Sequence, residues 1–215
     1  MIRGLYFDFD GTISDAKSIA YDSLIQTLDE FGYSYDKKVA RKLLGWKMDR
    51  IFKGLKLPVR DLKKVSKRFY EIFTYESLHG GIKLCVSVKP LYELAKKYHL
   101  VIVSNSETAF VKTSIKKLGL NGLFSHVYGS EKFRNKDDFL KAIFRKKKIK
   151  HNEAMYIGDR FSDVKYARRS GCITVAIHNS CAWSTLKEIK AEKPDYIIKD
   201  FYGLKKIVEK INNTQ

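Results

Sequence analysis

The amino-acid sequence predicts an α/β protein, with a Rossmann-like parallel sheet core, helices on both faces, and a smaller all-helical cap inserted after the first strand. Two patterns in the 215 residues carry this prediction. From about residue 89 onward, short apolar runs alternate with stretches of helical periodicity, as in sheets built from strand–helix–strand units. Residues 14–88 show helical periodicity alone. We therefore expect a core domain at 1–13 and 89–215, and a cap domain at 14–88.

The first strand is predicted at residues 5–9, an apolar and aromatic run that ends at a turn signal, Asp10-Gly11-Thr12. In the inserted segment, apolar residues share one face over 19–31, and Gly32 follows as a stop signal. Further helices of the insertion are predicted at 39–44, 48–52 and 61–73.

The remaining elements alternate along the chain. Strands are predicted at 100–103, 126–128, 154–157, 173–177 and 196–198, and helices at 91–98, 108–118, 136–147 and 162–169, with a basic helix at the end. The run at 100–103 is rich in β-branched residues, which is typical of a strand covered on both faces. Ligands of such sheets bind beyond the carboxyl ends of the strands.

The composition excludes several classes of protein. Hydrophobic residues make up 44% and charged residues 31%, with 3 Pro and 13 Gly, so neither a disordered nor a collagen-like chain fits. The sequence holds neither an apolar run long enough to span a membrane nor a signal peptide, and we expect a cytoplasmic protein. Cys85, Cys172 and Cys181 lack the spacing of a zinc site or a disulfide framework.

The first polar group is the string Asp8-Phe9-Asp10-Gly11-Thr12. Alternation along a strand puts Asp8 and Asp10 on the same side, and Gly11 allows the chain to turn away. Two carboxylates this close repel unless a cation lies between them or one of them takes up a proton. A magnesium ion would satisfy them, and a carboxylate beside it can attack phosphorus as a nucleophile.

Two further groups follow the next strands. Ser104 and Asn105 end the strand at 100–103 and offer hydroxyl and main-chain N–H donors to a phosphate oxygen, although a helix cap is the commoner use of such a serine. Lys132, Arg134 and Lys136 precede a helix, and a cation there would neutralise charge on a phosphoryl group. We favour Lys136 and leave the other two open.

The fourth group follows the strand at 154–157. Gly158 and Asp159 end this strand, and the first turn of the next helix brings Asp163 back beside Asp159. Alone, Asp163 would be read as complementing the helix N-terminus. Together with the other groups, these acids answer the requirements of magnesium-assisted phosphoryl transfer.

With these four groups in this order, the sequence resembles the haloacid-dehalogenase-like (HAD) hydrolase superfamily, and is most similar to its phosphoglycolate phosphatase and β-phosphoglucomutase branch. The resemblance covers 6–15 and 88–215 as core, with the segment between them matching a helical cap. The motifs at Asp8 and Asp159 are the specific ones. The third motif departs from the family pattern, because no proline follows Lys136.

The resemblance implies roles for the acids and the lysine. Asp8 would be the nucleophile that forms an aspartyl-phosphate, and Asp10 the general acid and base. Magnesium would be held by the carboxylate of Asp8, the main-chain carbonyl of Asp10 and the side chain of Asp159, with Asp163 as outer support or a further ligand. Lys136 would bridge Asp8 and the phosphate.

It also implies substrate-binding residues. Ser104 would bind a phosphoryl oxygen, helped by main-chain donors near Gly11, Thr12 and Asn105. Because dehalogenating members of the family lack a second aspartate at the position of Asp10, the resemblance disfavours halide displacement.

The segment at 41–47 resembles the cap turn that faces the active site in this branch. Gly45 would permit the bend, Trp46 could cover an apolar or ring face of the substrate, and Arg41 or Lys47 could meet a second anion. The alternative is that Trp46 packs between cap helices and that both basic side chains are solvated.

The net charge leaves the choice of ligand open. The chain has 42 basic and 24 acidic residues, a formal charge of +18, which would attract nucleic acid or anionic membrane or steer a phosphorylated small molecule. The basic run at 145–150 motivates a nucleic-acid-binding alternative, but aromatic residues do not interleave with it, and the acids at the strand ends would repel a polyanion.

We therefore predict a magnesium-dependent phosphatase of small phosphorylated metabolites, of the phosphoglycolate, sugar phosphate or nucleotide type, acting as a monomer or homodimer. A phosphosugar mutase of the same fold is the alternative.

Overall fold

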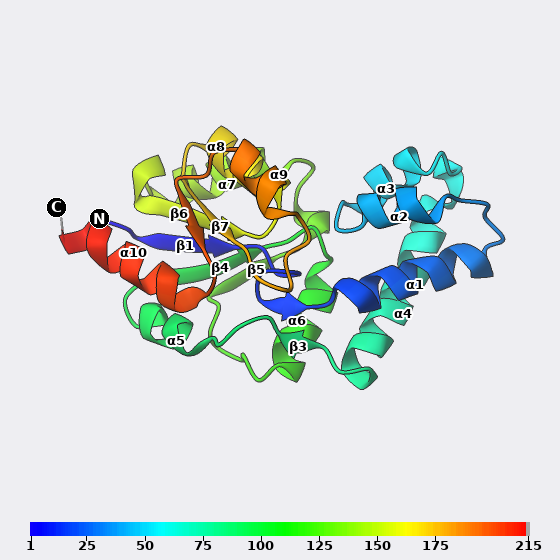
Figure 1. The fold of residues 1–215 in the computed structure, drawn as a ribbon, viewed down its shortest axis with the longest axis horizontal. Helices are drawn as coiled ribbons and strands as arrows, with labels where there is room; N and C mark the ends of the chain where they lie inside the picture. Colours follow the sequence, from blue (N-terminus) through cyan, green and yellow to red (C-terminus); the bar gives the residue numbers. More distant parts are fainter. Residues whose placement is uncertain (214–215) are drawn as a thin grey trace.

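A six-stranded parallel sheet forms the centre of the computed structural model, which describes residues 1–213 (Figure 1). The strands lie in the order β5-β4-β1-β6-β7-β8, and each neighbouring pair is parallel. Their bounds are β1 (Gly4–Phe7), β4 (His99–Val103), β5 (His126–Tyr128), β6 (Ala154–Gly158), β7 (Ile173–Ile177) and β8 (Tyr196–Ile198). The predicted α/β fold class is confirmed.

The central strand β1 is covered on both faces. Phe7 is paired in register with Ile102 of β4 and Ile157 of β6, so the carboxyl ends of these three strands meet at one edge of the sheet. Alternation sends Phe7 to one face, where its ring lies 6.1 Å from that of Phe201, and Tyr6 to the other, where its ring lies 5.1 Å from that of Phe144. Burial on both faces explains the nearly continuous apolar run in the sequence.

Helices form a layer on each side of the sheet (Figure 1). One layer contains α7 (Lys136–Lys147), α8 (Phe161–Ser170) and α9 (Leu186–Ala191), and the other contains α5 (Lys89–Ala95), α6 (Thr108–Lys117) and α10 (Phe201–Asn213). Short 3-10 turns, η2 (Ser130–Lys132) and η3 (His151–Glu153), precede α7 and β6. The sequence prediction omitted α9, because a helix of six residues shows little periodicity.

A helical insertion lies beyond the carboxyl edge of the sheet (Figure 1). It consists of α1 (Lys17–Glu30), α2 (Lys37–Leu43), α3 (Met48–Gly54), η1 (Val59–Asp61) and α4 (Leu62–His79), and α1 packs on α4. At its base, β2 (Ser14–Asp15) pairs antiparallel with β3 (Lys83–Leu84). The expectation of an insertion made only of helices missed this pair, because two-residue strands are too short to produce an alternating pattern.

None of the helices within residues 1–213 combines the length and the apolar character that crossing a membrane would need.

Candidate active site

The candidate active site lies at the carboxyl edge of the sheet, under the helical insertion. Asp8 directly follows β1, Ser104 directly follows β4, and Asp159 directly follows β6. Because these strands are adjacent and parallel, their ends deliver residues distant in sequence to one place.

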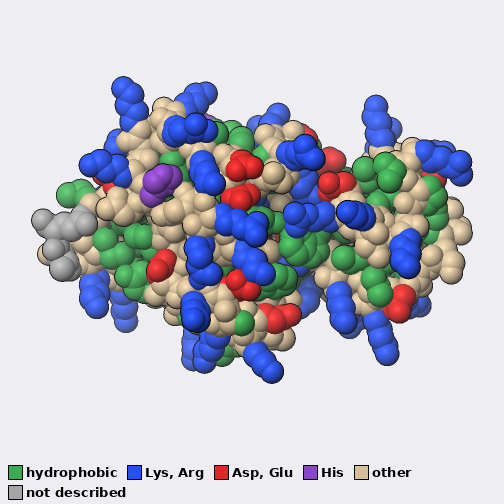
Figure 2. All heavy atoms as spheres, turned by 90° about the horizontal axis from the view of Figure 1, so that it is seen from above, with side chains coloured by type: hydrophobic (Ala, Val, Ile, Leu, Met, Phe, Trp, Pro, Cys, Tyr) green, Lys and Arg blue, Asp and Glu red, His purple; other side chains and the backbone are tan. Residues whose placement is uncertain are grey.

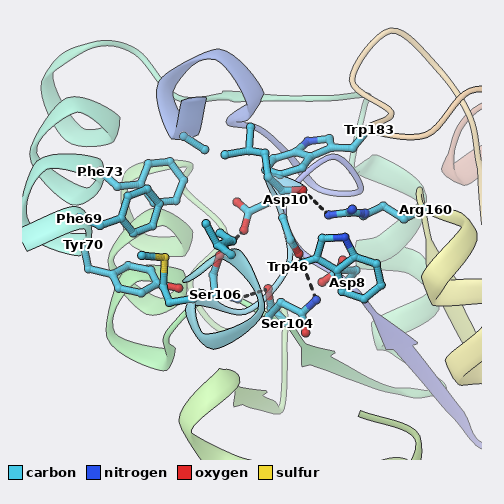
Figure 3. Close-up of a pocket in the computed structure, with 16 residues that line it drawn as sticks. Asp8, Asp10, Trp46, Phe69, Tyr70, Phe73, Ser104, Ser106, Arg160 and Trp183 are labelled. Carbon is cyan, nitrogen blue, oxygen red and sulfur yellow. Dashed lines mark hydrogen bonds between the residues drawn. The ribbon is translucent and has the colours of Figure 1, made fainter. Parts of the chain in front are cut away.

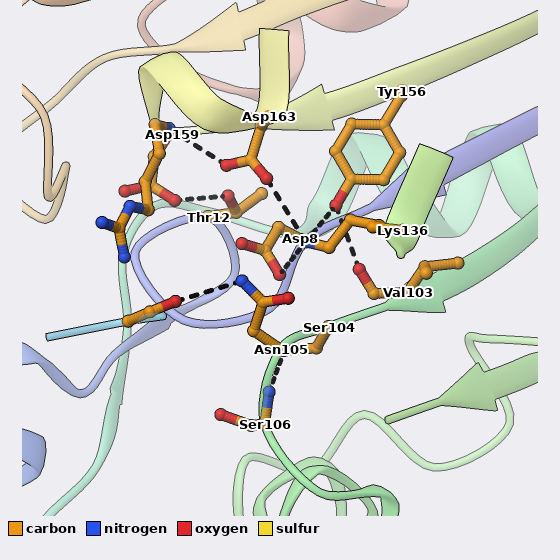
Figure 4. A network of polar contacts seen from close by, with 12 residues as sticks. Asp8, Thr12, Val103, Ser104, Asn105, Ser106, Lys136, Tyr156, Asp159 and Asp163 are labelled. Atoms are coloured by element: carbon orange, nitrogen blue, oxygen red, sulfur yellow. Dashed lines mark hydrogen bonds and ion pairs between the residues drawn. The ribbon is translucent and has the colours of Figure 1, made fainter. Parts of the chain in front are cut away.

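Three buried carboxylates converge there (Figure 4). One oxygen each from Asp8, Asp159 and Asp163 lies within 4.8 Å of the others. The three side chains belong to residues that are 5%, 0% and 2% exposed, so water screens their charges poorly. Of the acids in the first and fourth motifs, Asp8, Asp159 and Asp163 are the ones that come together here.

Lys136 is the cation that the fold brings to the acids. Its Nζ lies 3.4 Å from Oδ1 of Asp8 and 3.3 Å from Oδ1 of Asp163, and it donates a hydrogen bond to Oη of Tyr156 at 2.8 Å. Burial alone would lower the pKa of Lys136, but the charges of Asp8 and Asp163 hold that pKa above its ordinary value. Lys132 and Arg134 are exposed instead.

The donor set fits a divalent cation. The three carboxylates and the single lysine leave an excess of negative charge, and burial followed by carboxylate repulsion raises the pKa of Asp159 and brings that of Asp163 to about 6. Oδ1 of Asp8 is buried and, apart from its ion pair with Lys136, accepts no hydrogen bond within the described part of the chain. Hard oxygen ligands with an unmet charge are what Mg²⁺ prefers.

Asp10 turns its carboxyl group away from this cluster. It accepts hydrogen bonds from Oγ of Ser106 at 2.5 Å and from Oγ of Ser14 at 3.1 Å, and it lines the cavity beneath the insertion together with Asp8 (Figure 3). Burial, with a further contribution from Asp8, raises the pKa of Asp10 to about 7. A carboxyl group with that pKa can give or take a proton near neutral pH.

Thr12 and Trp183 hold Asp159 in place, and Gly11 leaves room for it. Gly11 has φ +83°, and a side chain there would overlap Oδ2 of Asp159. Oγ1 of Thr12 donates to Oδ1 of Asp159 at 3.0 Å, and the main-chain N–H of Trp183 donates to Oδ2 at 2.7 Å. The hydroxyl of Thr12 therefore binds a carboxylate. The sequence resemblance implied only main-chain contacts from this segment to phosphate.

The residues after β4 line the same cavity (Figure 3). Ser104 is buried, and its Oγ accepts the main-chain N–H of Ser106 at 3.1 Å. Asn105 reaches across to the insertion, where its Nδ2 donates to the carbonyl of Gly45 at 3.1 Å. Asn105 thus connects the sheet edge to the turn between α2 and α3.

The turn residues differ in their placement. Trp46 lines the cavity, and Lys47 donates from Nζ to the carbonyls of Ser130 and Phe133 at 2.8 and 2.6 Å. Arg41 does not join them: it is exposed, and its guanidinium lies 4.6 Å from the ring centroid of Tyr21 on α1. The expectation that Arg41 meets a substrate anion is not supported, because its position on α2 turns it toward α1.

Sequence reasoning missed Arg160 and Trp183. Arg160 is 6% exposed, and its Nη1 donates to the carbonyl of Leu44 at 2.7 Å. Arg160 lies between Asp159 and Asp163 in the sequence. A basic residue between two candidate ligand acids could have been recognised as a functional residue. Trp183 lies in a loop without periodicity, and the sequence around it gave no signal.

Two cavities flank Trp46 and Asn105. The inner one, beside Asp8 and Asp10, has a volume of about 30 Å³, and apolar residues of the insertion cover it (Figure 3). The outer one has a volume of about 410 Å³. Its charged lining residues are Lys47, Arg50, Lys53, Arg134, Lys136 and Arg169, with Asp49 and Asp137. Figure 2 shows Lys and Arg side chains over the α/β core, over the helical insertion and at the junction between them.

A family model described as haloacid dehalogenase-like hydrolase matches residues 5–177. The chain therefore belongs to the haloacid dehalogenase-like hydrolase family. The family resemblance drawn from the sequence motifs is confirmed.

Individual relatives are distant but cover nearly the whole chain. A protein proposed to be the pyrophosphatase PpaX, from Caldanaerobacter subterraneus, is 28% identical, with 97% of this chain and 95% of the relative covered. The phosphoglycolate phosphatase of Aquifex aeolicus is 26% identical, with 97% of both chains covered.

Solved structures share the fold. A hydrolase from Pseudomonas syringae superposes with a TM-score of 0.82 at 17% identity, covering 98% of this chain and 99% of its own. CbbY from Rhodobacter sphaeroides, in complex with phosphate, gives a TM-score of 0.80 at 16% identity, covering 94% and 95%.

Proposed function

We propose that this protein is a magnesium-dependent phosphatase of small phosphorylated metabolites, with Asp8 as the nucleophile. The observation that carries the proposal is the convergence of three buried carboxylates and one buried lysine at the end of β1. Such a set combines a nucleophile, a cation site and a positive charge within reach of one phosphoryl group.

The chain's own residues support two chemical steps. In the first, an oxygen of Asp8 forms a bond to phosphorus, the bond from phosphorus to the alcohol oxygen breaks, and Asp10 gives its proton to the leaving oxygen. In the second, Asp10 takes a proton from water as that water attacks phosphorus, and the Asp8–phosphorus bond breaks to release phosphate. Lys136 and Ser104 bind the phosphoryl oxygens throughout.

Asp8, Asp159, Asp163 and the main-chain carbonyl of Asp10 are the groups we assign to Mg²⁺. When bound, Mg²⁺ offsets the charge of the carboxylates and of the phosphoryl group. The hydrogen bonds from Thr12 and from the main chain of Trp183 orient Asp159 for this role.

The substrate class follows from the surroundings of the site. The basic lining of the outer cavity favours anionic ligands and would raise their local concentration. Several relatives are named phosphoglycolate phosphatases, which makes phosphoglycolate the first ester to test, followed by sugar phosphates and nucleotides. We propose residues 14–88 as a cap domain that contacts the leaving group.

The purified protein should release inorganic phosphate from at least one ester of such a panel when Mg²⁺ is present. Excess EDTA should stop the release and added Mg²⁺ should restore it, because without the cation the charge of the buried carboxylates is unmet. Mg²⁺ should also stabilise the folded protein, by about 2.7 kcal/mol at a concentration of 100 times Kd, and the thermal midpoint should rise accordingly.

The assay is run without any bisphosphate. Steady phosphate release under these conditions supports a phosphatase, whereas isomerisation of a sugar phosphate that needs a bisphosphate activator would indicate the mutase instead. Turnover that continues in EDTA would contradict the assignment of the carboxylates to a cation.

A further inference from the structure

The turn between α2 and α3 docks on the core through a stack of three side chains. The guanidinium of Arg160 lies between two indole rings, with Cζ 5.2 Å from the ring centroid of Trp46 and 5.8 Å from that of Trp183 (Figure 3). Its Nη1 also donates to the carbonyl of Leu44 in the insertion. We call Trp46, Arg160 and Trp183 the clasp, because they join the insertion to the loops after β6 and β7.

The core side of the clasp also orients two of the carboxylates. The main-chain N–H of Arg160 donates to Oδ2 of Asp163 at 3.1 Å. The main-chain N–H of Trp183 donates to Oδ2 of Asp159 at 2.7 Å. The two residues whose side chains hold the insertion therefore use their backbone to hold the candidate cation ligands.

The fit at the clasp is close enough to transmit small displacements. Gly45 has φ +80°, and a Cβ added there would overlap Nη1 of Arg160 and lie 2.5 Å from ring carbons of Trp183. Because the turn touches both residues without a gap, it cannot move closer to the core while Arg160 and Trp183 stay in place.

The composition of the clasp favours its opening. With the turn docked, the inner cavity beside Asp8 and Asp10 has a volume of about 30 Å³, and Gly45 and Trp46 of the turn line it, so lifting the turn widens the space for a phosphate ester. Nε of Arg160 and Nε1 of Trp183 are buried without a hydrogen-bond partner among the described residues. Leaving buried donors unpaired is unfavourable, and opening the clasp gives both of them access to water.

We propose that Arg160 is a positioning residue that couples docking of the insertion to binding of a divalent cation by Asp159 and Asp163. The inference rests on the proposed function, because it assumes the cation site. Coupling of this kind is reciprocal: a cation that fixes the two carboxylates favours the docked clasp, and the docked clasp raises the affinity for the cation.

Two glycine substitutions test the coupling from the side of the insertion. Gly45→Ala prevents docking, whereas Gly32→Ala is the matched control, since Gly32 also has a positive φ, +69°, but a Cβ there meets nothing within 4 Å. Mg²⁺ binding is measured by isothermal titration calorimetry without any phosphate ester. We expect G45A to raise the Kd for Mg²⁺ by about 10- to 100-fold, as for lost outer partners of a metal site, and G32A to keep the wild-type value.

Intrinsic fluorescence reports the state of the clasp independently, because Trp46 and Trp183 are the 2 tryptophans of the chain. Mg²⁺ should shift the wild-type emission to shorter wavelength as both indoles leave water. G45A should emit at longer wavelength and respond little to Mg²⁺. Arg160→Ala should behave like G45A, with circular dichroism as a check of folding and Arg145→Ala, the same change at an exposed arginine of α7, as its control.

The outcomes separate the inference from the proposed function. If G45A shows an open clasp by fluorescence yet binds Mg²⁺ as tightly as the wild type, the coupling is wrong and the phosphatase proposal is untouched. If wild-type protein shows the coupling but hydrolyses no ester, the proposed function fails and the coupling stands. Wild-type protein that binds no Mg²⁺ would overturn both.

Discussion

Asp8→Asn should reduce phosphate release by about 10⁴-fold or more, because the amide keeps the shape of the side chain but cannot form the bond to phosphorus. The substitution also removes one of the three carboxylates that we assign to the cation. The measurement is the initial rate of phosphate release from the best ester of the panel at saturating Mg²⁺.

Loss of activity in this variant is informative only if the fold survives. Asp8 lies in a cluster where three buried carboxylates share a single lysine, so removing one negative charge relieves repulsion as well as breaking the contact with Lys136. We therefore expect no fall in the thermal midpoint in metal-free buffer. Asp22→Asn, the same change at an exposed position, should leave turnover unchanged. Wild-type rates in D8N would refute the nucleophile assignment.

The sequence predicts the sheet well because its strands are buried on both faces. A continuous apolar run such as the one in β4 is typical of a strand in that position, and the polar residues that follow such runs must lie at one edge when the strands are parallel. The proximity of Asp8 and Asp159 follows from topology alone, without knowledge of any side-chain conformation.

Side-chain directions beyond the strand ends are less predictable. Asp10 turns toward Ser14 and Ser106 instead of joining the cluster, since the chain reverses at Gly11 after β1 has ended. Contacts between the insertion and the core, such as that of Arg160 with Leu44, depend on how the insertion packs on the sheet and its helices. Local patterns in the sequence carry no information about that packing.

Lys136 shows what the sequence can and cannot predict about a single side chain. The sequence placed a cation before α7 but left three candidates, because Lys132, Arg134 and Lys136 differ little in local composition. The structure distinguishes them by burial: Lys136 is 1% exposed, and the other two are exposed. Its position at the start of α7 sends the side chain beneath the helix to Asp8 and Asp163.

Lys136→Met should lower kcat/KM by about 10²- to 10³-fold, since methionine keeps an unbranched side chain but removes the charge that faces the phosphoryl oxygens. It should also destabilise the metal-free protein by about 3–5 kcal/mol, because the carboxylates lose their buried partner. Lys132→Met and Arg134→Met are the matched controls, and each should change the stability by no more than about 0.5 kcal/mol. Chemical denaturation and steady-state kinetics measure the two effects.

The stability deficit of Lys136→Met should shrink as the pH falls from about 8 to about 6. Burial and the neighbouring acids already raise the pKa of Asp159 and Asp163, and loss of the lysine, whose charge lowers the pKa of Asp163, raises that pKa further. A carboxyl group whose pKa is higher in the folded than in the unfolded state binds more protons when folded, so lowering the pH stabilises the folded state. A deficit that stays constant over this range would mean that Lys136 supports the fold through packing, and that its charge is not what balances the carboxylates.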